Sequence, residues 1–433
     1  MHPDLSFEQI PPLAAPLRFF LTAPWFGVVA GLVLAASGDA AFTSRWSPAS
    51  LAVTHFFALG FMLQVMCGAL FQFLPVGIGQ AIHRPLALSA IVHPLLTVGT
   101  LLLGAGFLAG QFALLLAAAA LLVVGIGLFA LAAAGALWRV RPVTPVAALL
   151  RLALAALVVT ALLGTLLAAG LSLSRPLPLA ALTDVHLAWG LGGWALSLLI
   201  AVSAFVVPMF QLTPAYPQHL TRTVTPALLL LLLLWSLRPS GFAPLLTEFA
   251  GLGLAILATS YAITTLLLQT QGRRKTHDAT ESFFRAGMAC LLVVTVGIAA
   301  MFALPTLAND PRSALWLGVL IFPGTFSCVI QGMLYKIVPF LAWLHLQRTG
   351  APIAQLPNMR TIIPEKNARH QMQLHLLALA TLLVAVAYPA LTRIAGLLLA
   401  ASYGWLGANL IGGARRYRSF RDRIPASAAN RES

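Results

Sequence analysis

The chain has 433 residues, of which 60% are hydrophobic and only 9% are charged, and its mean hydropathy is +0.91. Apolar runs of about 20 or more residues recur along almost its whole length, which indicates a polytopic helical membrane protein. An outer-membrane β-barrel is excluded, because its segments are short and alternate in hydropathy. The net charge of +15 favours contact with anionic membrane lipid, and no soluble basic domain exists to bind nucleic acid.

The apolar runs between polar or Pro/Gly-rich breaks predict twelve membrane-spanning helices. Only Gly110 and Gln111 interrupt the chain between the third and the fourth. The N-terminus lacks the basic region and the cleavage site of a signal peptide, so we expect the first span to be retained. The predicted spans are residues 15–37, 49–77, 86–108, 111–138, 145–172, 181–210, 222–237, 242–270, 283–304, 313–343, 370–390 and 392–413.

Basic residues are distributed unequally between the two sides of the predicted membrane domain. With the N-terminus in the cytoplasm, all but five of the 26 Lys and Arg residues fall in loops and ends on the cytoplasmic side. This asymmetry predicts that both termini are cytoplasmic and that residues 414–433 form a basic tail beside anionic headgroups. We expect one polytopic domain over residues 1–433, in a bacterial cytoplasmic (inner) membrane.

Two small residues and a proline, spaced by eight and seven positions, recur in predicted spans 2, 6 and 10. The three copies are Gly60, Gly68 and Pro75, then Gly193, Ala201 and Pro208, then Gly324, Gly332 and Pro339. Successive copies are 133 and 131 residues apart, so the spans divide into three sets of four, over approximately 15–138, 145–270 and 283–413. Each copy lies on one face of its helix, which would admit close packing or a flat ligand.

Twelve spans in three pseudo-threefold four-helix arcs, with spans 2, 6 and 10 innermost, resemble the catalytic subunit I of heme-copper oxidases and nitric oxide reductases. The NnrS family of heme- and copper-containing proteins, linked to nitric oxide stress, is similar in length and span number. The resemblance implies a heme or copper site and contact with other respiratory-chain subunits or a periplasmic electron carrier. It implies a role in electron transfer, in nitric oxide or heme stress, or in the assembly of a respiratory complex.

The oxidase reaction centre is missing from this sequence. Span 10 has no histidine between Arg312 and Pro339, where the oxidase pattern places heme ligands. Gly190 stands four residues after His186, where that pattern has a tyrosine, and span 7 offers no metal ligand. No acidic residue lies deep in a span to relay protons. We therefore expect neither oxygen reduction nor proton pumping.

His55 in span 2 and His186 in span 6 are the candidate cofactor ligands. His55 matches the span 2 heme ligand of the oxidase pattern, and both histidines are expected at similar depth. Counted from the repeat prolines, their positions differ by about 200° around the helix, so both can face the space between spans 2 and 6. We hypothesise a heme b held by His55 and His186, with Gly60 and Gly193 making room for the macrocycle. Copper is the alternative, because imidazole suits both metals.

Other interpretations stay open at this point. Each histidine of the pair would serve equally well as an interhelical hydrogen-bonding group. His93 and His375, in spans 3 and 11, have the same two interpretations, structural hydrogen bonding or a second metal or heme site. A permease with structural histidines is the alternative function, since twelve spans and internal repeats are usual in permeases. The threefold parallel repeat and the lack of a deep acid argue against it.

Overall fold

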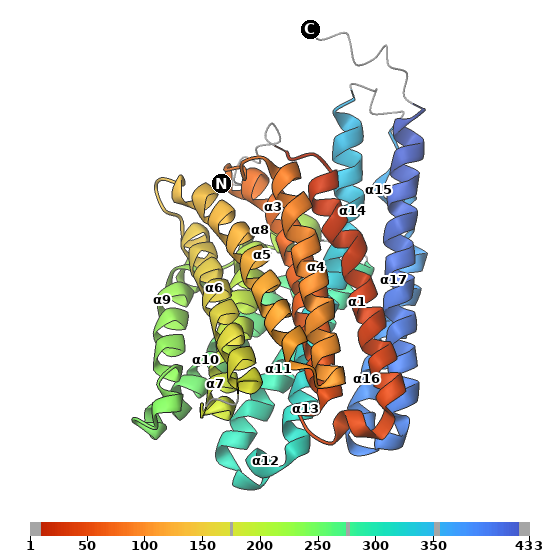
Figure 1. The fold of residues 1–433 in the computed structure, drawn as a ribbon. Coiled ribbons are helices and arrows are strands. Elements are labelled where there is room, and N and C mark those ends of the chain that lie inside the picture. Colours follow the sequence, from red (N-terminus) through yellow and green to blue (C-terminus); the bar gives the residue numbers. More distant parts are fainter. Residues whose placement is uncertain (1–9, 174–175, 274–277, 350–355, 424–433) are drawn as a thin grey trace.

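The computed structural model describes residues 10–173, 176–273, 278–349 and 356–423, and its long helices run along one common direction (Figure 1). Twelve helices are long and apolar enough to cross a membrane, as the sequence predicts. In chain order, these spans are built from α1 (Ala14–Ser37) with η1 (Gly38–Phe42), α2 (Pro48–His55) with η2 (Phe56–Leu63) and α3 (Gln64–Ile78), α4 (Pro85–Ala109), α5 (Phe112–Trp138), α6 (Pro145–Ser172), α7 (Leu179–Leu187) with η3 (Ala188–Leu196) and α8 (Ser197–Gln211), α9 (Gln218–Trp235) with η4 (Arg238–Ser240), α10 (Pro244–Thr270), α11 (Ala279–Ala303), α13 (Pro311–Val319) with η5 (Leu320–Phe326) and α14 (Ser327–Gln347), α16 (Glu365–Ala387), and η7 (Pro389–Leu391) with α17 (Thr392–Arg421).

Local sequence explains where the helices begin and end. Proline occupies the first turn of many of them, where its missing N–H is not needed and its fixed φ suits the helix. The short break between α4 and α5 is made by Gly110, whose φ of +65° is the left-handed conformation that glycine adopts without strain. Two short helices were not predicted, α12 (Pro305–Asn309) and α15 (Met359–Ile362).

Spans 2, 6 and 10 form the interior of the bundle. Their most apolar windows are 78%, 61% and 72% buried, whereas no other span exceeds 50%. Each of the three contains a π-helical segment, η2, η3 or η5, and successive segments begin 132 residues apart. A π-helix adds a residue to the turn and is frequent at functional sites. The three π-helical segments thus lie in the same three spans as the repeated pattern of two small residues and a proline, and they recur at nearly the same interval.

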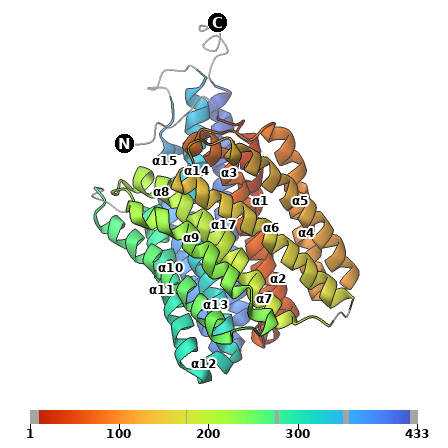
Figure 2. The same cartoon turned by 90° about the vertical axis from the view of Figure 1, so that its left-hand side faces the viewer.

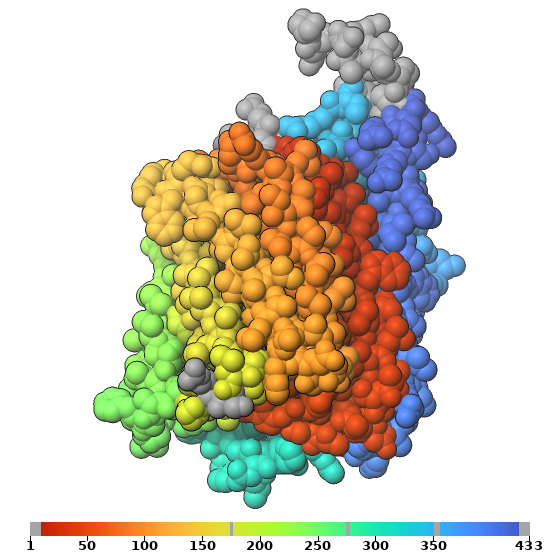
Figure 3. Space-filling model, viewed as in Figure 1, coloured from red at the N-terminus to blue at the C-terminus, as the bar shows by residue number. Residues whose placement is uncertain are grey.

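The outer spans pack as neighbours along the chain. α4 lies beside α5, and α5 lies beside α6, on one face of the molecule (Figures 1 and 3). On another face, α9, α10 and α11 follow one another in the same way (Figure 2). α1 packs against α17, which brings the first and the last span together. This arrangement leaves α4, α5 and α6 around the gap between spans 2 and 6.

α1 begins and α17 ends at the same end of the bundle, here called the terminal side, and α12 lies at the opposite end, the far side (Figure 1). α17 continues to Arg421, so residues 414–421 of the predicted basic tail are part of this helix rather than a separate segment. Residues 424–433 of that tail lie outside the described residues.

Candidate functional site

His55 is the last residue of α2, immediately before the π-helical segment η2. Its Nδ1 donates a hydrogen bond to the carbonyl oxygen of Leu51, at 2.7 Å, one turn earlier in the same helix. The imidazole ring faces Phe107 of α4, with the two ring centroids 5.2 Å apart. α2 and α4 therefore fix both the position and the direction of this ring.

His186 lies in α7, two residues before η3, and has a similar environment. Its Nδ1 donates to the carbonyl oxygen of Thr160 in α6, at 3.1 Å. Gly164, one turn further along α6, faces the same ring, since a Cβ atom added there would lie 3.1 Å from Cε1 of His186. A small residue at position 164 is thus needed where the ring meets α6.

These hydrogen bonds set the tautomer of both histidines. A carbonyl oxygen can only accept, so the proton of each neutral ring must be on Nδ1, and Nε2 then carries a lone pair. Within the described part of the chain, neither Nε2 atom has a hydrogen-bond partner. An imidazole whose Nδ1–H is held by a carbonyl and whose Nε2 is open is the usual state of a histidine that binds a metal.

The two histidines lie in one region on the far side of the bundle. Their rings are close enough to interact electrostatically, and both are only partly buried. Arg45, just before α2, and Asp184 of α7 form an ion pair, with Nη1 and Oδ1 3.0 Å apart. This contact joins the starts of spans 2 and 6, so the two histidines share a similar depth.

The helix segments around the pair are only partly buried. Residues 158–167 of α6 make almost three helical turns, and none of them is buried, whereas most of residues 147–157 are. In span 6, only Val185 and Trp189 are buried among residues 179–192, although this span is interior further along. Both histidines therefore lie where the protein covers its helices less completely than in the interior of the bundle.

Gly60 and Gly193, expected to make room for a macrocycle, face neighbouring helices instead. A Cβ atom on Gly60 would lie 2.2 Å from the ring of Phe26 in α1, and one on Gly193 would lie 2.7 Å from Cβ of Ala156 in α6. Both glycines therefore permit close helix packing. The small residue in contact with a candidate ligand is Gly164, which the sequence analysis did not identify because it lies outside the repeated pattern.

His93 and His375 have hydrogen-bonded environments apart from that pair. Nε2 of His93 is 2.9 Å from the hydroxyl of Thr22, and the ring packs edge to face on Phe19. Nε2 of His375 must donate to the carbonyl oxygen of Pro323, at 2.9 Å, which leaves Nδ1 to accept from Gln331 at 3.1 Å. Both nitrogens of His375 are thus engaged, as the structural interpretation of this residue requires.

His375 is one end of a buried hydrogen-bonded network between α14, α16 and α17. Gln371 donates to Gln331, at 2.7 Å, and accepts from Tyr335, whose hydroxyl accepts from Asn409. The carbonyl of Pro323 belongs to the π-helical segment η5, so an irregular turn of span 10 supplies the acceptor for His375. Nothing in the spacing of Gln331 and Tyr335 in the sequence shows that α16 and α17 carry their partners.

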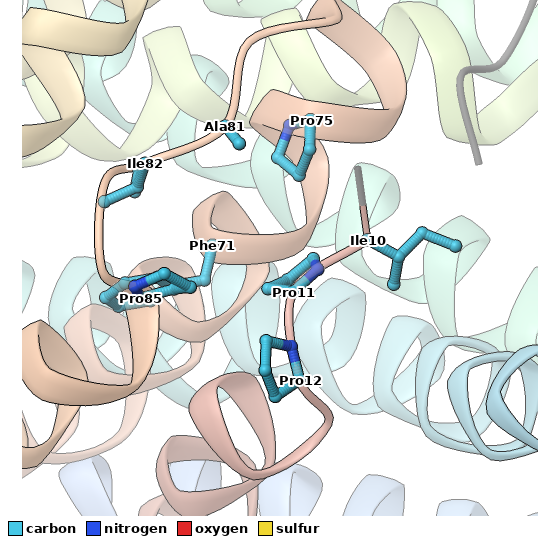
Figure 4. A pocket seen from close by; sticks show the side chains of 8 residues that line it. All are labelled: Ile10, Pro11, Pro12, Phe71, Pro75, Ala81, Ile82 and Pro85. Carbon is cyan, nitrogen blue, oxygen red and sulfur yellow. The ribbon is translucent and has the colours of Figure 1, made fainter. Parts of the chain in front are cut away.

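A cavity of about 280 Å³ opens elsewhere, beside the start of α1 and the end of α3 (Figure 4). Its walls are Ile10, Pro11, Pro12, Phe71, Pro75, Ala81, Ile82 and Pro85. These side chains offer no acid, base, nucleophile or metal ligand. The chemistry of the molecule is therefore better sought at the histidine pair.

The donor set of the histidine pair suits a heme better than an isolated ion. Among the described residues, no three His, Cys, Asp or Glu side chains gather as metal ligands would. Two imidazoles complete the coordination of heme iron, because the macrocycle supplies the other four nitrogens. A copper ion would require ligands beyond the pair. Comparison with protein-family models and with curated protein sequences returns no match for the chain.

Proposed function

We propose that this chain is an integral membrane protein that binds a b-type heme between spans 2 and 6, with His55 and His186 as the axial ligands. One observation carries the proposal: both rings have Nδ1 held by a backbone carbonyl and no partner on Nε2 among the described residues, and both are only partly buried. When bound, the heme would supply one-electron redox chemistry. The protein would hold its plane between α4, α5 and α6 and keep bulk water from it.

Ligation by two histidines favours electron transfer over oxygen chemistry, because both axial positions are taken by protein. The interior position and equal spacing of η2, η3 and η5 support an arrangement in three four-helix arcs, as in heme-copper oxidase subunit I and NnrS-like proteins. On this proposal the basic terminal side faces the cytoplasm of a bacterial cell and the heme lies toward the periplasm. A periplasmic electron carrier or another respiratory-chain subunit would then be its redox partner.

The test is a visible spectrum of the full-length protein, purified in mild detergent from heme-replete cells. We expect a Soret band, a sharp α band on reduction, and about one heme b per chain by pyridine hemochrome, as a low-spin two-histidine heme gives. Metal analysis of the same sample measures copper. A protein with neither heme nor copper would overturn the proposal. A protein that contains copper but no heme would show that the histidine pair binds copper, and the heme proposal would be wrong.

A permease is the second candidate, and the network around His375 is the observation that favours it. Gln331, Gln371 and His375 are fully buried polar side chains within the membrane-spanning region, where such groups commonly mark a solute path. All three are satisfied by one another or by backbone, however, which is the state of a structural network. A heme-free and copper-free wild-type protein would make this candidate the leading one.

A further inference from the structure

Asp184 lies at the centre of a cluster of charges directly beside the histidine pair. Its Oδ1 pairs with Nη1 of Arg45, at 3.0 Å, and its Oδ2 pairs with Nε of Arg238, at 3.4 Å. Arg45 precedes span 2, Asp184 belongs to span 6, and Arg238 ends span 7. We call these three residues the far-side clasp. One carboxylate thus joins three spans through two guanidinium groups.

The clasp also controls the rotation of α7. Asp184 and His186 are two residues apart, which places them about 200° apart around the helix. Asp184 faces Arg45 and Arg238. His186 therefore lies on the opposite side of the helix, where its ring contacts Thr160 and Gly164 of α6. In addition, Nε1 of Trp235 donates to the backbone carbonyl of Asp184, at 3.1 Å. The contacts of Asp184 with Arg45, Arg238 and Trp235 thus hold α7 by the face opposite His186.

The same clasp is rigidly connected to His55. Ser47 caps α2 by accepting from the backbone N–H of Ser50, at 3.1 Å. The hydroxyls of Ser47 and Ser50 both donate to the carbonyl of Ala41, at 2.9 and 2.7 Å. The turn that carries Arg45 is thereby tied to the first turn of α2, and α2 ends at His55. Displacement of Arg45 would move the histidine with it.

We infer that Asp184 is a positioning residue that fixes the separation and mutual orientation of His55 and His186 through the Arg45–Asp184–Arg238 clasp. The inference rests on the proposed heme site. Asp184 touches no cofactor; it acts by aligning α2 and α7, so that both Nε2 atoms meet the iron on opposite faces. Partners one step behind a metal ligand typically change the affinity for the metal by about 10- to 100-fold. A single exposed ion pair contributes little, but Asp184 pairs with two arginines at once, and such a network can change heme affinity measurably.

The experiment compares Asp184→Asn with the wild-type heme protein. Asparagine keeps the shape and the backbone bond to Trp235 but removes the charge that pairs with Arg45. Arg238 keeps its closer partner Glu248 of α10, whose Oε1 lies 2.7 Å from Nη1, so the largest displacement is expected at Arg45. We expect a five-coordinate, high-spin heme fraction in the absorption and electron paramagnetic resonance spectra, and a heme affinity lowered about 10- to 100-fold. Asp310→Asn is the matched control, because Asp310 caps α13 on the far side and asparagine caps equally well.

Arg45→Gln provides the independent arm of the test, since Asp184 then keeps Arg238 and the fold is less disturbed. It should give the same high-spin fraction, and Arg45→Lys should partly restore the low-spin spectrum. A wild-type low-spin spectrum and unchanged heme affinity in folded Asp184→Asn or Arg45→Gln protein would overturn the role of the clasp. A wild-type protein without heme would instead refute the proposed function, and the inference with it.

Discussion

The surroundings of His55 and His186 differ from those of His375 in one respect that decides their chemistry. In the pair, a carbonyl holds each Nδ1 and each Nε2 has no partner among the described residues. In His375, both nitrogens are used, and Tyr403 packs edge to face on the ring. The same residue type thus keeps one ring nitrogen without a partner in one region and uses both nitrogens in a closed core in the other. Hydrogen-bond saturation, rather than depth in the bundle, separates the two.

Packing reinforces this difference. Phe57 and Phe61 of span 2 contact the ring of Tyr403, and all three side chains are fully buried. Phe57 also stacks on Phe322 of span 10, with ring centroids 6.5 Å apart, so aromatic side chains pack between spans 2 and 10. Residues 158–167 of α6 and most of residues 179–192 of span 6 are, by contrast, not buried. In the oxidase pattern, the heme with two axial histidines lies between spans 2 and 10, so the proposed site is displaced by one third of a turn around the bundle.

Among the substitutions that test this difference, removal of either proposed ligand should have the largest effect on heme content. His55→Ala and His186→Ala are expected to lower the heme content of the purified protein at least about tenfold, because one axial ligand of two is lost. Pyridine hemochrome per folded chain is the measurement. His375→Ala should retain the wild-type Soret band. A band that survives both His55→Ala and His186→Ala unchanged would show that the axial ligands lie elsewhere.

A larger side chain at position 164 should weaken heme binding without replacing either ligand. Gly164→Leu adds atoms where a Cβ alone would already lie 3.1 Å from the ring of His186, so the ring must leave the carbonyl of Thr160. We expect heme affinity to fall about 10- to 100-fold, measured by heme titration of the apo-protein. Gly135→Leu on α5, which meets open space, is the matched control. Equal heme affinity in both variants would show that α6 does not border the cofactor.

At His375, the expected change is in stability and not in the spectrum. His375→Leu would leave the carbonyl of Pro323 and the amide of Gln331 buried without this partner. Each such group costs about 1–3 kcal/mol, although partners within a membrane bundle reduce this figure. Thermal unfolding in detergent should detect the loss. His370→Leu, exposed on the same helix, is the control. A shifted Soret band in His375→Leu would show that the two regions are coupled.

The sequence predicted those features that depend on local composition. Span number follows from apolar length, and the break at Gly110 follows from the need for a left-handed residue between two long helices. The π-helical segments were not predicted, because an added residue in a helical turn changes no hydropathy pattern. α17 extends to Arg421, beyond the predicted span, because hydropathy falls at the charged residues whereas Arg is a good helix former.

The sequence alone does not show which residues lie opposite a candidate site residue. The repeated pattern predicts that Gly60 of span 2 and Gly193 of span 6 lie where another group approaches closely. It does not show whether that group is a bound ligand or a neighbouring side chain, here Phe26 and Ala156. Similarly, His375 could be identified as an intramembrane polar group, whereas its saturation depends on Pro323 and Gln331 from another span. The role of His55 and His186 as heme ligands stays a prediction for the spectrum to test.

The smallest expected effect concerns Tyr403, whose buried hydroxyl makes no hydrogen bond of good geometry within the described part of the chain. An unpartnered buried hydroxyl costs free energy in the folded state, so its removal loses little. Tyr403→Phe should therefore change the free energy of unfolding by less than about 1 kcal/mol, toward stabilisation, and leave the heme spectrum unchanged. Ser402→Ala is the comparison, because the Ser402 hydroxyl accepts from Gln371 at 3.0 Å and its removal should destabilise. Marked destabilisation by Tyr403→Phe would mean that an ordered water completes the network, and that the region around His375 is wetter than its packing indicates.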